Sequence, residues 1–268
     1  MGLLDKKNAL ITGSRKGIGR GIALRFASEG ANVGINDIVN DEISHSVVEE
    51  SKNKGVRSSF LQYDVSTVNG IESLIDEFVN QFGSIDILIN NAILQPQDRN
   101  IWEVDELFWD KVMNLSLKAY FFGAKRAAKH MISQGNGGKI ISLASVHAYA
   151  AMPDWTIYGV AKSGLIRMAK GLSVDLRGKG ININCIAPGA ISNSLPKNSS
   201  DFSSVDGIPH PDSIAKDLPT QRGGLPSDIA NAALYLCSDL GSYVNGETIL
   251  VDGGMIAAAP LRLPTEED

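Results

Sequence analysis

The sequence predicts an α/β protein whose single domain is a doubly wound parallel sheet. Short apolar segments alternate with helical segments along the chain, which is typical of parallel βαβ units. A glycine-rich turn follows the first apolar segment and precedes an amphipathic helix. The 268 residues are enough for one large domain with a buried core, and there is no internal repeat or linker. We therefore expect residues 1–268 to form one catalytic, dinucleotide-binding domain.

The individual elements follow from this alternation. The expected strands are the apolar segments 8–12, 32–36, 57–63, 85–89, 140–143, 181–186 and 248–251. Expected helices include 41–54, 68–82, 104–134 and 226–238. The segment 192–224 is rich in Ser, Pro, Asp and Gly without periodicity, and long loops of that kind usually form lids or binding segments. We predict that it is the substrate loop.

The glycine-rich turn is the first candidate binding element. Gly13, Gly17 and Gly19 lie between a strand and a helix, so the helix would direct its N-terminal amides at a bound pyrophosphate. The spacing GxxxGxG differs from the commoner GxGxxG, and a structural turn is the competing interpretation. The cofactor contacts expected in this turn are Gly13, Arg15, Lys16, Gly17, Ile18 and Gly19.

The end of the second strand bears on the choice of cofactor. Asp37 follows Gly19 by eighteen positions, where a dinucleotide fold places an acidic residue that accepts hydrogen bonds from the adenosine ribose and repels a 2′-phosphate. Asp37 therefore favours NAD. Against it, Arg15 or Lys16 could reach a phosphate, or could be solvated surface charges. We expect NAD as the cofactor, with NADP possible.

The stretch 139–170 holds the candidate catalytic residues. Tyr158 and Lys162 are four apart and would share one helix face, although such a pair often has no role beyond that face. Ser145 follows a strand, where doubly wound sheets bind ligands. Lowering the phenol pKa by about 3 takes about 4 kcal/mol, which we expect Lys162 and an oxidised nicotinamide to supply. Tyr158 would then accept a proton from an alcohol whose oxygen Ser145 holds.

Composition narrows the partners and the compartment. The net charge of −5 argues against nucleic acid or an anionic membrane as a partner. Two cysteines, Cys185 and Cys237, are too few for a disulfide framework, and we expect both to be buried. Apolar runs are too short for a secretory signal or a membrane span. We expect a cytoplasmic protein with a small-molecule substrate and no metal.

Several motifs in order carry a family likeness. Over about residues 6–254 the chain is similar to the short-chain dehydrogenase/reductases. The similar positions are the stretches TGSRKGIGRGIA, NNA, YGVAK and IAPGAI, the pair Asp64-Val65, Asn114, Ser145, and RGGLPSDIANAALYLCSD with YVNGETILVDGG. The resemblance implies a Rossmann-type fold with a seven-stranded parallel sheet, commonly assembled as a tetramer.

The resemblance also implies roles for single residues. Tyr158 matches the acid/base, Lys162 the lysine that binds the nicotinamide ribose, Ser145 the serine that polarises the substrate oxygen, and Asn114 the asparagine that positions a relay water. From the residues alone, Asn114 is either a core or interface amide or a residue that bends its helix and holds a water. The remaining positions assigned to the cofactor are Asp37, Asp64, Val65, Asn91, Pro188, Gly189 and Ile191.

Two positions depart from the family pattern. Ile93 stands where glycine usually follows Asn-Asn-Ala. The threonine usual near the carboxamide is missing, and Ser192, Asn193 and Ser194 occupy its neighbourhood. We therefore expect the backbone at Ile93 and the hydroxyl near the carboxamide to be placed somewhat differently here.

The sequence specifies the substrate less closely than it specifies the fold or the cofactor. Short stretches, including Ser145-Val146-His147 and Asp252-Gly253-Gly254-Met255, are similar to the sugar 1-dehydrogenases of the family. This resemblance favours oxidation of an aldose at C1 to a lactone, with His147, Gln95 and Asn193 beside Ser145 and Tyr158 as substrate contacts. A solvated His147 is the alternative. Other readings are an NADPH-dependent carbonyl or 3-oxoacyl thioester reductase, a polyol or hydroxysteroid dehydrogenase, and a non-catalytic dinucleotide sensor.

Overall fold

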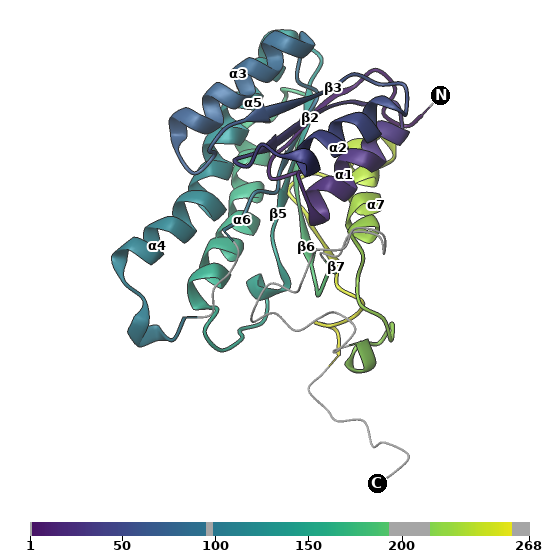
Figure 1. Cartoon of the computed structure of the whole chain (residues 1–268). Helices are drawn as coiled ribbons and strands as arrows, with labels where there is room; N and C mark the ends of the chain where they lie inside the picture. The colour runs from purple at the N-terminus through teal and green to yellow at the C-terminus, as the bar shows by residue number, and fades with distance from the viewer. Residues whose placement is uncertain (1, 95–98, 193–214, 259–268) are drawn as a thin grey trace.

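Seven parallel strands form a single sheet in a computed structural model that describes residues 2–94, 99–192 and 215–258 (Figure 1). The strand order is β3-β2-β1-β4-β5-β6-β7. The strands are β1 (Asn8–Ile11), β2 (Asn32–Asp37), β3 (Ser58–Gln62), β4 (Ile87–Asn90), β5 (Gly138–Leu143), β6 (Ile181–Pro188) and β7 (Thr248–Val251). The larger helices are α1 (Gly17–Ser28), α2 (Glu42–Lys52), α3 (Val68–Phe82), α4 (Glu106–Met113), α5 (Ala119–Gln134), α6 (Thr156–Asp175) and α7 (Pro226–Cys237). The predicted doubly wound fold is confirmed.

The chain changes direction at the centre of the sheet. From β1 it winds outward through β2 to β3, and then returns to β4 on the other side of β1. In register, Leu10 of β1 faces Gly34 of β2 and Leu88 of β4. The carboxyl ends of β1 and β4 therefore diverge into helices on opposite faces. This is the switch point at which doubly wound sheets bind ligands.

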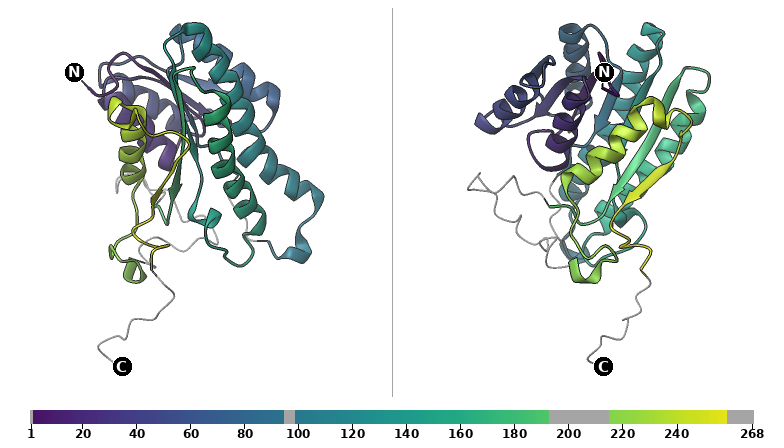
Figure 2. Two further views of the ribbon diagram at one scale, coloured as in Figure 1. Left: turned by 180° about the vertical axis from the view of Figure 1, so that it is seen from behind. Right: turned by 90° about the vertical axis from the view of Figure 1, so that its right-hand side faces the viewer.

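Helices cover both faces of the sheet (Figure 2). One face packs against α1, α2 and α7, with Phe26, Val47 and Ile229 in its core. The other packs against α3, α5 and α6, with Phe78, Met131 and Leu165. Since both faces are buried, the central strands β1 and β4 are mainly apolar and are buried at every position.

The expected helix 104–134 is not continuous. It consists of α4, a π-helical turn at Asn114–Lys118 and α5, and α4 begins at Glu106. The amide of Ala119 donates to the carbonyl of Asn114, which inserts one residue into the helical repeat. The structure therefore confirms a distortion at Asn114.

Three smaller features complete the fold. β4 begins at Ile87 and not at residue 85, because the amide of Ile85 donates to the side chain of Gln134. Cys185 and Cys237 are free and buried, as expected, and burial raises the pKa of both thiols. None of the helices in the described ranges has the length and apolar character needed to cross a membrane.

Candidate active site and dinucleotide site

The residues assigned from the sequence gather along one edge of the sheet. The glycine turn follows β1, Asp37 ends β2, Asp64 and Val65 follow β3, and Asn91 follows β4. Ser145 lies two residues beyond β5, and Gly189 and Ile191 lie just beyond β6. Because the strands are parallel, all of these positions lie at the carboxyl edge, where a ligand can contact them together.

The glycine turn has room for backbone but not for side chains. Gly13 and Gly17 have φ values of +61° and +53°, in the left-handed region that glycine tolerates. A Cβ at Gly19 would lie 2.5 Å from the carbonyl oxygen of Gly13 and 2.6 Å from Nδ2 of Asn91. The N-terminus of α1 begins at Gly17 and favours a bound anion. These features fit a dinucleotide pyrophosphate.

Side chains from neighbouring strands hold this turn in place. Nδ2 of Asn91 donates to the carbonyls of Thr12 and Gly13, at 2.8 and 2.9 Å. The hydroxyl of Thr12 accepts from the amides of Asn91 and Ala92. Oδ1 of Asn36 accepts from the amide of Gly13 at 3.4 Å. The side chain of Asn91, expected to contact the cofactor, thus shapes the turn, and sequence reasoning did not identify Thr12 or Asn36.

Asp37, at the end of β2, and Arg15, in the glycine turn, both have polar partners within the chain. Oδ1 of Asp37 accepts from the amide of Val39 at 3.0 Å. The guanidinium of Arg15 is paired with Asp41, just before α2, with Nε 2.9 Å from Oδ1 and a second contact between NH2 and Oδ2. The hydrogen bond to Asp41 raises the pKa of Arg15. Arg15, expected to be able to reach a phosphate, is therefore bound by a carboxylate.

The third and sixth strands supply simpler contacts. Oδ1 of Asp64 accepts from the amide of Ser66 at 2.9 Å, and the side chain of Val65 is buried. The amide of Gly189 donates to the carbonyl of Val251 at 3.0 Å, and a Cβ at Gly189 would lie 2.7 Å from Cα of Asp252. Ile191 forms an isolated bridge with Gly224. Pro188 ends β6.

Tyr158 and Lys162 share one face of α6, as the spacing predicts. Nζ of Lys162 lies 5.5 Å from the ring centre of Tyr158 and 5.0 Å from that of Tyr120. Lys162 is 1% exposed and donates to the carbonyl of Leu143 at 2.6 Å. Ser145 is buried, and its hydroxyl forms a hydrogen bond with Tyr158. The three residues assigned to catalysis therefore meet at one point.

Burial sets the direction of the pKa shifts of both Tyr158 and Lys162. Burial raises the pKa of Tyr158 to about 12, and the hydrogen bond from Ser145 opposes this only in part. Burial also lowers the pKa of Lys162 to about 7, so its ammonium is only partly charged near neutral pH. The desolvated lysine therefore does not activate the phenol by itself. The joint effect of Lys162 and an oxidised nicotinamide on the pKa of Tyr158 stays a prediction.

Asn114 lies at the start of the π-helical turn. Its Oδ1 accepts from Nζ of Lys118 at 3.4 Å. The π-helical turn that begins at Asn114 packs against α6. The proton-relay role that the family resemblance gives to Asn114 stays a prediction.

Two aromatic side chains pack against Tyr158. The ring of His147 lies 5.5 Å from that of Tyr158, edge to face, and 4.6 Å from that of Trp155. Trp155 is also 5.6 Å from Tyr158. The structure therefore places His147 beside the reactive phenol. Sequence reasoning missed Trp155, which is the N-cap residue of α6 and lies three positions before Tyr158.

Part of the predicted substrate region lies outside the described residues. Gln95 and Asn193 are there, as are residues 193–214 of the expected loop 192–224. At its two described ends, the amide of Ser192 donates to the carbonyl of Gly224 at 2.9 Å, and residues 215–217 form a short 3₁₀ helix. Ile93, which replaces the usual glycine, has an exposed side chain. Among the described side chains, no group of three His, Cys, Asp or Glu is placed to hold a metal.

A doubly wound sheet with a glycine turn after its first strand, and a Ser, Tyr and Lys converging after its fifth, defines a nicotinamide-dependent oxidoreductase. A family model described as enoyl-(acyl carrier protein) reductase matches residues 13–256. With the relatives below, this match shows that the chain belongs to the short-chain dehydrogenase/reductase family. The protein is an NAD(P)-dependent enzyme that acts on CH–OH groups.

The relatives act on different substrates. The chain is 38% identical over 257 residues to 2-dehydro-3-deoxy-D-gluconate 5-dehydrogenase of Escherichia coli, covering 95% of this chain and 97% of the relative. It is 37% identical over 249 residues to a 3-oxoacyl-[acyl-carrier-protein] reductase of Staphylococcus aureus, covering 93% and 98%. The crystal structure of acetoin dehydrogenase from Salmonella typhimurium has a TM-score of 0.85 at 31% identity, covering 95% and 98%. Related structures were determined with NAD and with NADPH.

Proposed function

We propose that this enzyme is an NAD-preferring dehydrogenase of a sugar or sugar-derived alcohol. The observation that supports this most is the convergence of Ser145, Tyr158 and Lys162 on an edge where Asp37 ends β2. The reaction moves a hydride between the nicotinamide and a secondary alcohol or hemiacetal carbon. Oxidation of an aldose at C1, which yields a lactone, is the form that the sequence resemblance favours.

Tyr158, Ser145 and Lys162 each have a separate role in this reaction. The glycine turn and Lys162 would hold the dinucleotide, and its nicotinamide would supply the hydride acceptor for the carbinol carbon. The phenol oxygen of Tyr158 takes the hydroxyl proton, and the hydroxyl of Ser145 donates a hydrogen bond to the same substrate oxygen. Lys162 lies beside the phenol and, when charged, stabilises the phenolate. By the family resemblance, the proton would then pass by way of Lys162 to a water held by Asn114.

Two observations support a sugar-type substrate. His147 packs against Tyr158 and can hydrogen-bond a hydroxyl next to the reacting carbon. The E. coli relative at 38% identity acts on a sugar-derived acid by its name. A polyhydroxylated substrate needs such polar contacts beside the reacting atom, because each buried hydroxyl must be paired.

A second candidate is a 3-oxoacyl thioester reductase, which uses the same residues in the opposite direction. The 37% identity to the S. aureus reductase over 98% of its length supports it. Asp37 opposes it by disfavouring NADPH, and the net charge of −5 opposes an acidic carrier protein as partner.

Initial rates with NAD and NADP in parallel test the proposal. The panel includes aldoses, sugar acids, polyols, steroids and simple secondary alcohols, with a 3-oxoacyl thioester and NADPH in the reverse direction. We expect the highest kcat/KM with NAD and a sugar-type alcohol. Turnover confined to the thioester and NADPH would instead establish the second candidate. Dinucleotide binding without turnover of any compound would establish the sensor.

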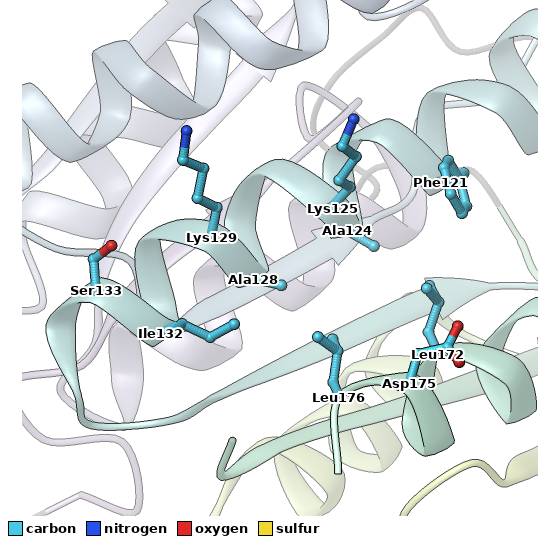
Figure 3. A pocket seen from close by; sticks show the side chains of 10 residues that line it. All are labelled: Phe121, Ala124, Lys125, Ala128, Lys129, Ile132, Ser133, Leu172, Asp175 and Leu176. Carbon is cyan, nitrogen blue, oxygen red and sulfur yellow. The ribbon is translucent and has the colours of Figure 1, made fainter. Parts of the chain in front are cut away.

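We also propose that the enzyme is a homotetramer in which the outer face of α5 and α6 pairs with a second copy. A groove of about 340 Å³ lies between these helices (Figure 3). Phe121 and Ile132, each about 40% exposed, lie on its α5 side. The groove holds Lys129 on α5 and Asp175 on α6, so a two-fold axis can set the lysine of one copy against the aspartate of the other.

Charges placed in the groove should dissociate the assembly. We expect Phe121→Glu combined with Ile132→Glu to lower the mass in solution from four chains to two, since each carboxylate would be buried against apolar surface. Sedimentation equilibrium measures the mass, and Ser46→Glu on the exposed face of α2 is the control. An unchanged mass would show that this face is not an interface.

A further inference from the structure

The contact between Arg15 and Asp41 joins the glycine turn to the second helix. The two residues are 26 positions apart, and their side chains are 12% and 34% exposed. Both oxygens of Asp41 contact the guanidinium, which is the geometry of a strong ion pair. Arg15 is thereby held in a fixed position within the turn that we assign to the cofactor.

Asp41 is itself held firmly. It is the N-cap of α2, and its Oδ1 accepts from the amides of Ile43 and Ser44, each at 3.1 Å. The hydroxyl of Ser44 accepts in turn from the amide of Asp41 at 2.9 Å, which completes a capping box. Because the carboxylate has these backbone partners as well, it cannot easily swing away with Arg15.

Asp37 belongs to the same electrostatic cluster. Its charge, together with that of Asp41, raises the pKa of Arg15. One guanidinium therefore lies under the influence of two carboxylates at the end of β2, the place that the proposed function gives to the adenosine ribose. A 2′-phosphate arriving there would meet these two negative charges, the neighbouring ammonium of Lys16 and a guanidinium that is already paired.

We propose that Asp41 is a cofactor-specificity residue, which selects NAD by keeping Arg15 in an ion pair and so denying it to a 2′-phosphate. Asp37 acts on the ribose itself, whereas Asp41 acts through Arg15. This inference rests on the proposed function, because it requires the dinucleotide to bind at the glycine turn. It differs from the effect of Asp37 in depending on the presence of Arg15.

Asp41→Asn tests this with little change to the helix. Asn caps a helix as well as Asp does, so α2 keeps its cap while the carboxylate charge disappears. We expect the dissociation constant of NADP⁺, measured by calorimetry, to fall about tenfold or more, since a guanidinium would become available to the phosphate. The constant for NAD⁺ should change less than about threefold. The pair 2′,5′-ADP and 5′-ADP should reproduce this difference without the nicotinamide.

A double variant and a distant control isolate the cause. Arg15→Ala in the Asp41→Asn background should remove the gain in NADP⁺ affinity. Asp76→Asn breaks a similar arginine–carboxylate pair, with Arg126 between α3 and α5, and should leave the ratio of the two dissociation constants unchanged. Asp41→Ser, which also caps a helix, replaces Asp41→Asn if the latter does not fold.

The outcomes separate this inference from the proposed function. Unchanged NADP⁺ affinity in both Asp41 variants, or a gain that persists without Arg15, would overturn the role of Asp41 while leaving NAD binding intact. Failure of the wild-type enzyme to bind either dinucleotide would instead overturn the site itself. A gain that depends on Arg15 and weakens at high salt supports the ion-pair mechanism.

Discussion

Tyr158→Phe is expected to lower kcat by about a thousandfold or more, because the substrate proton loses its acceptor. The ring packing against His147 and Trp155 would remain, since only the hydroxyl is removed. The dissociation constant for NAD⁺ should therefore change little. Steady-state rates and calorimetry measure the two quantities separately.

Tyr120→Phe is a matched control for this result. Tyr120 is also a buried phenol close to Lys162, but its hydroxyl donates to the carbonyl of Ala92 at 2.9 Å. Its loss should cost about 1 kcal/mol of unfolding free energy and reduce kcat far less than Tyr158→Phe. Retained turnover in Tyr158→Phe, with folding intact, would remove Tyr158 from the mechanism.

Lys162→Met is expected to abolish most turnover and to change how stability depends on pH. The substitution removes the cation beside the Tyr158 phenol, and with it a stabilising charge for the phenolate. It also removes a buried ammonium whose folded-state pKa is about 7, against about 10.4 for lysine in the unfolded chain.

The sign of the pH effect follows from proton binding. Between pH 7 and pH 10 the unfolded wild type binds more protons at Lys162 than the folded form does, so the contribution of Lys162 to wild-type stability rises with pH. Below pH 7 the buried ammonium exerts its full destabilising effect. The unfolding free energy of Lys162→Met minus that of the wild type should therefore fall by about 3 kcal/mol from pH 7 to pH 10.

Denaturant titrations of both proteins across this pH range give the difference directly. Lys170→Met, at an exposed position on the same helix, is the control, and its difference from the wild type should stay level because its ammonium remains in water. If the difference in unfolding free energy between Lys162→Met and the wild type is also independent of pH, the folded-state pKa of Lys162 is not lowered.

The sequence by itself determined the architecture and the principal residues of the site. Apolar segments alternating with helices specify a parallel sheet, because both faces of each strand must be covered. The spacing of Tyr158 and Lys162 places them on one helix face. The turn can be predicted from Gly13, Gly17 and Gly19, because their positions have no room for side chains or require a positive φ. Helices and strands repeat with fixed periods along the chain, so the spacing of residues shows which side chains share a face.

Only the tertiary structure decided what surrounds these residues. Three contacts could not be predicted from the spacing of residues along the chain. They are the ion pair of Arg15 with Asp41, the hydrogen bonds from Asn91 to the glycine turn, and the contact of Trp155 with His147. The raised pKa of Tyr158 in the folded chain arises in the same way, because burial depends on every element packed around the phenol. Desolvation and long-range contacts are properties of the assembled core, and spacing along the chain does not encode them.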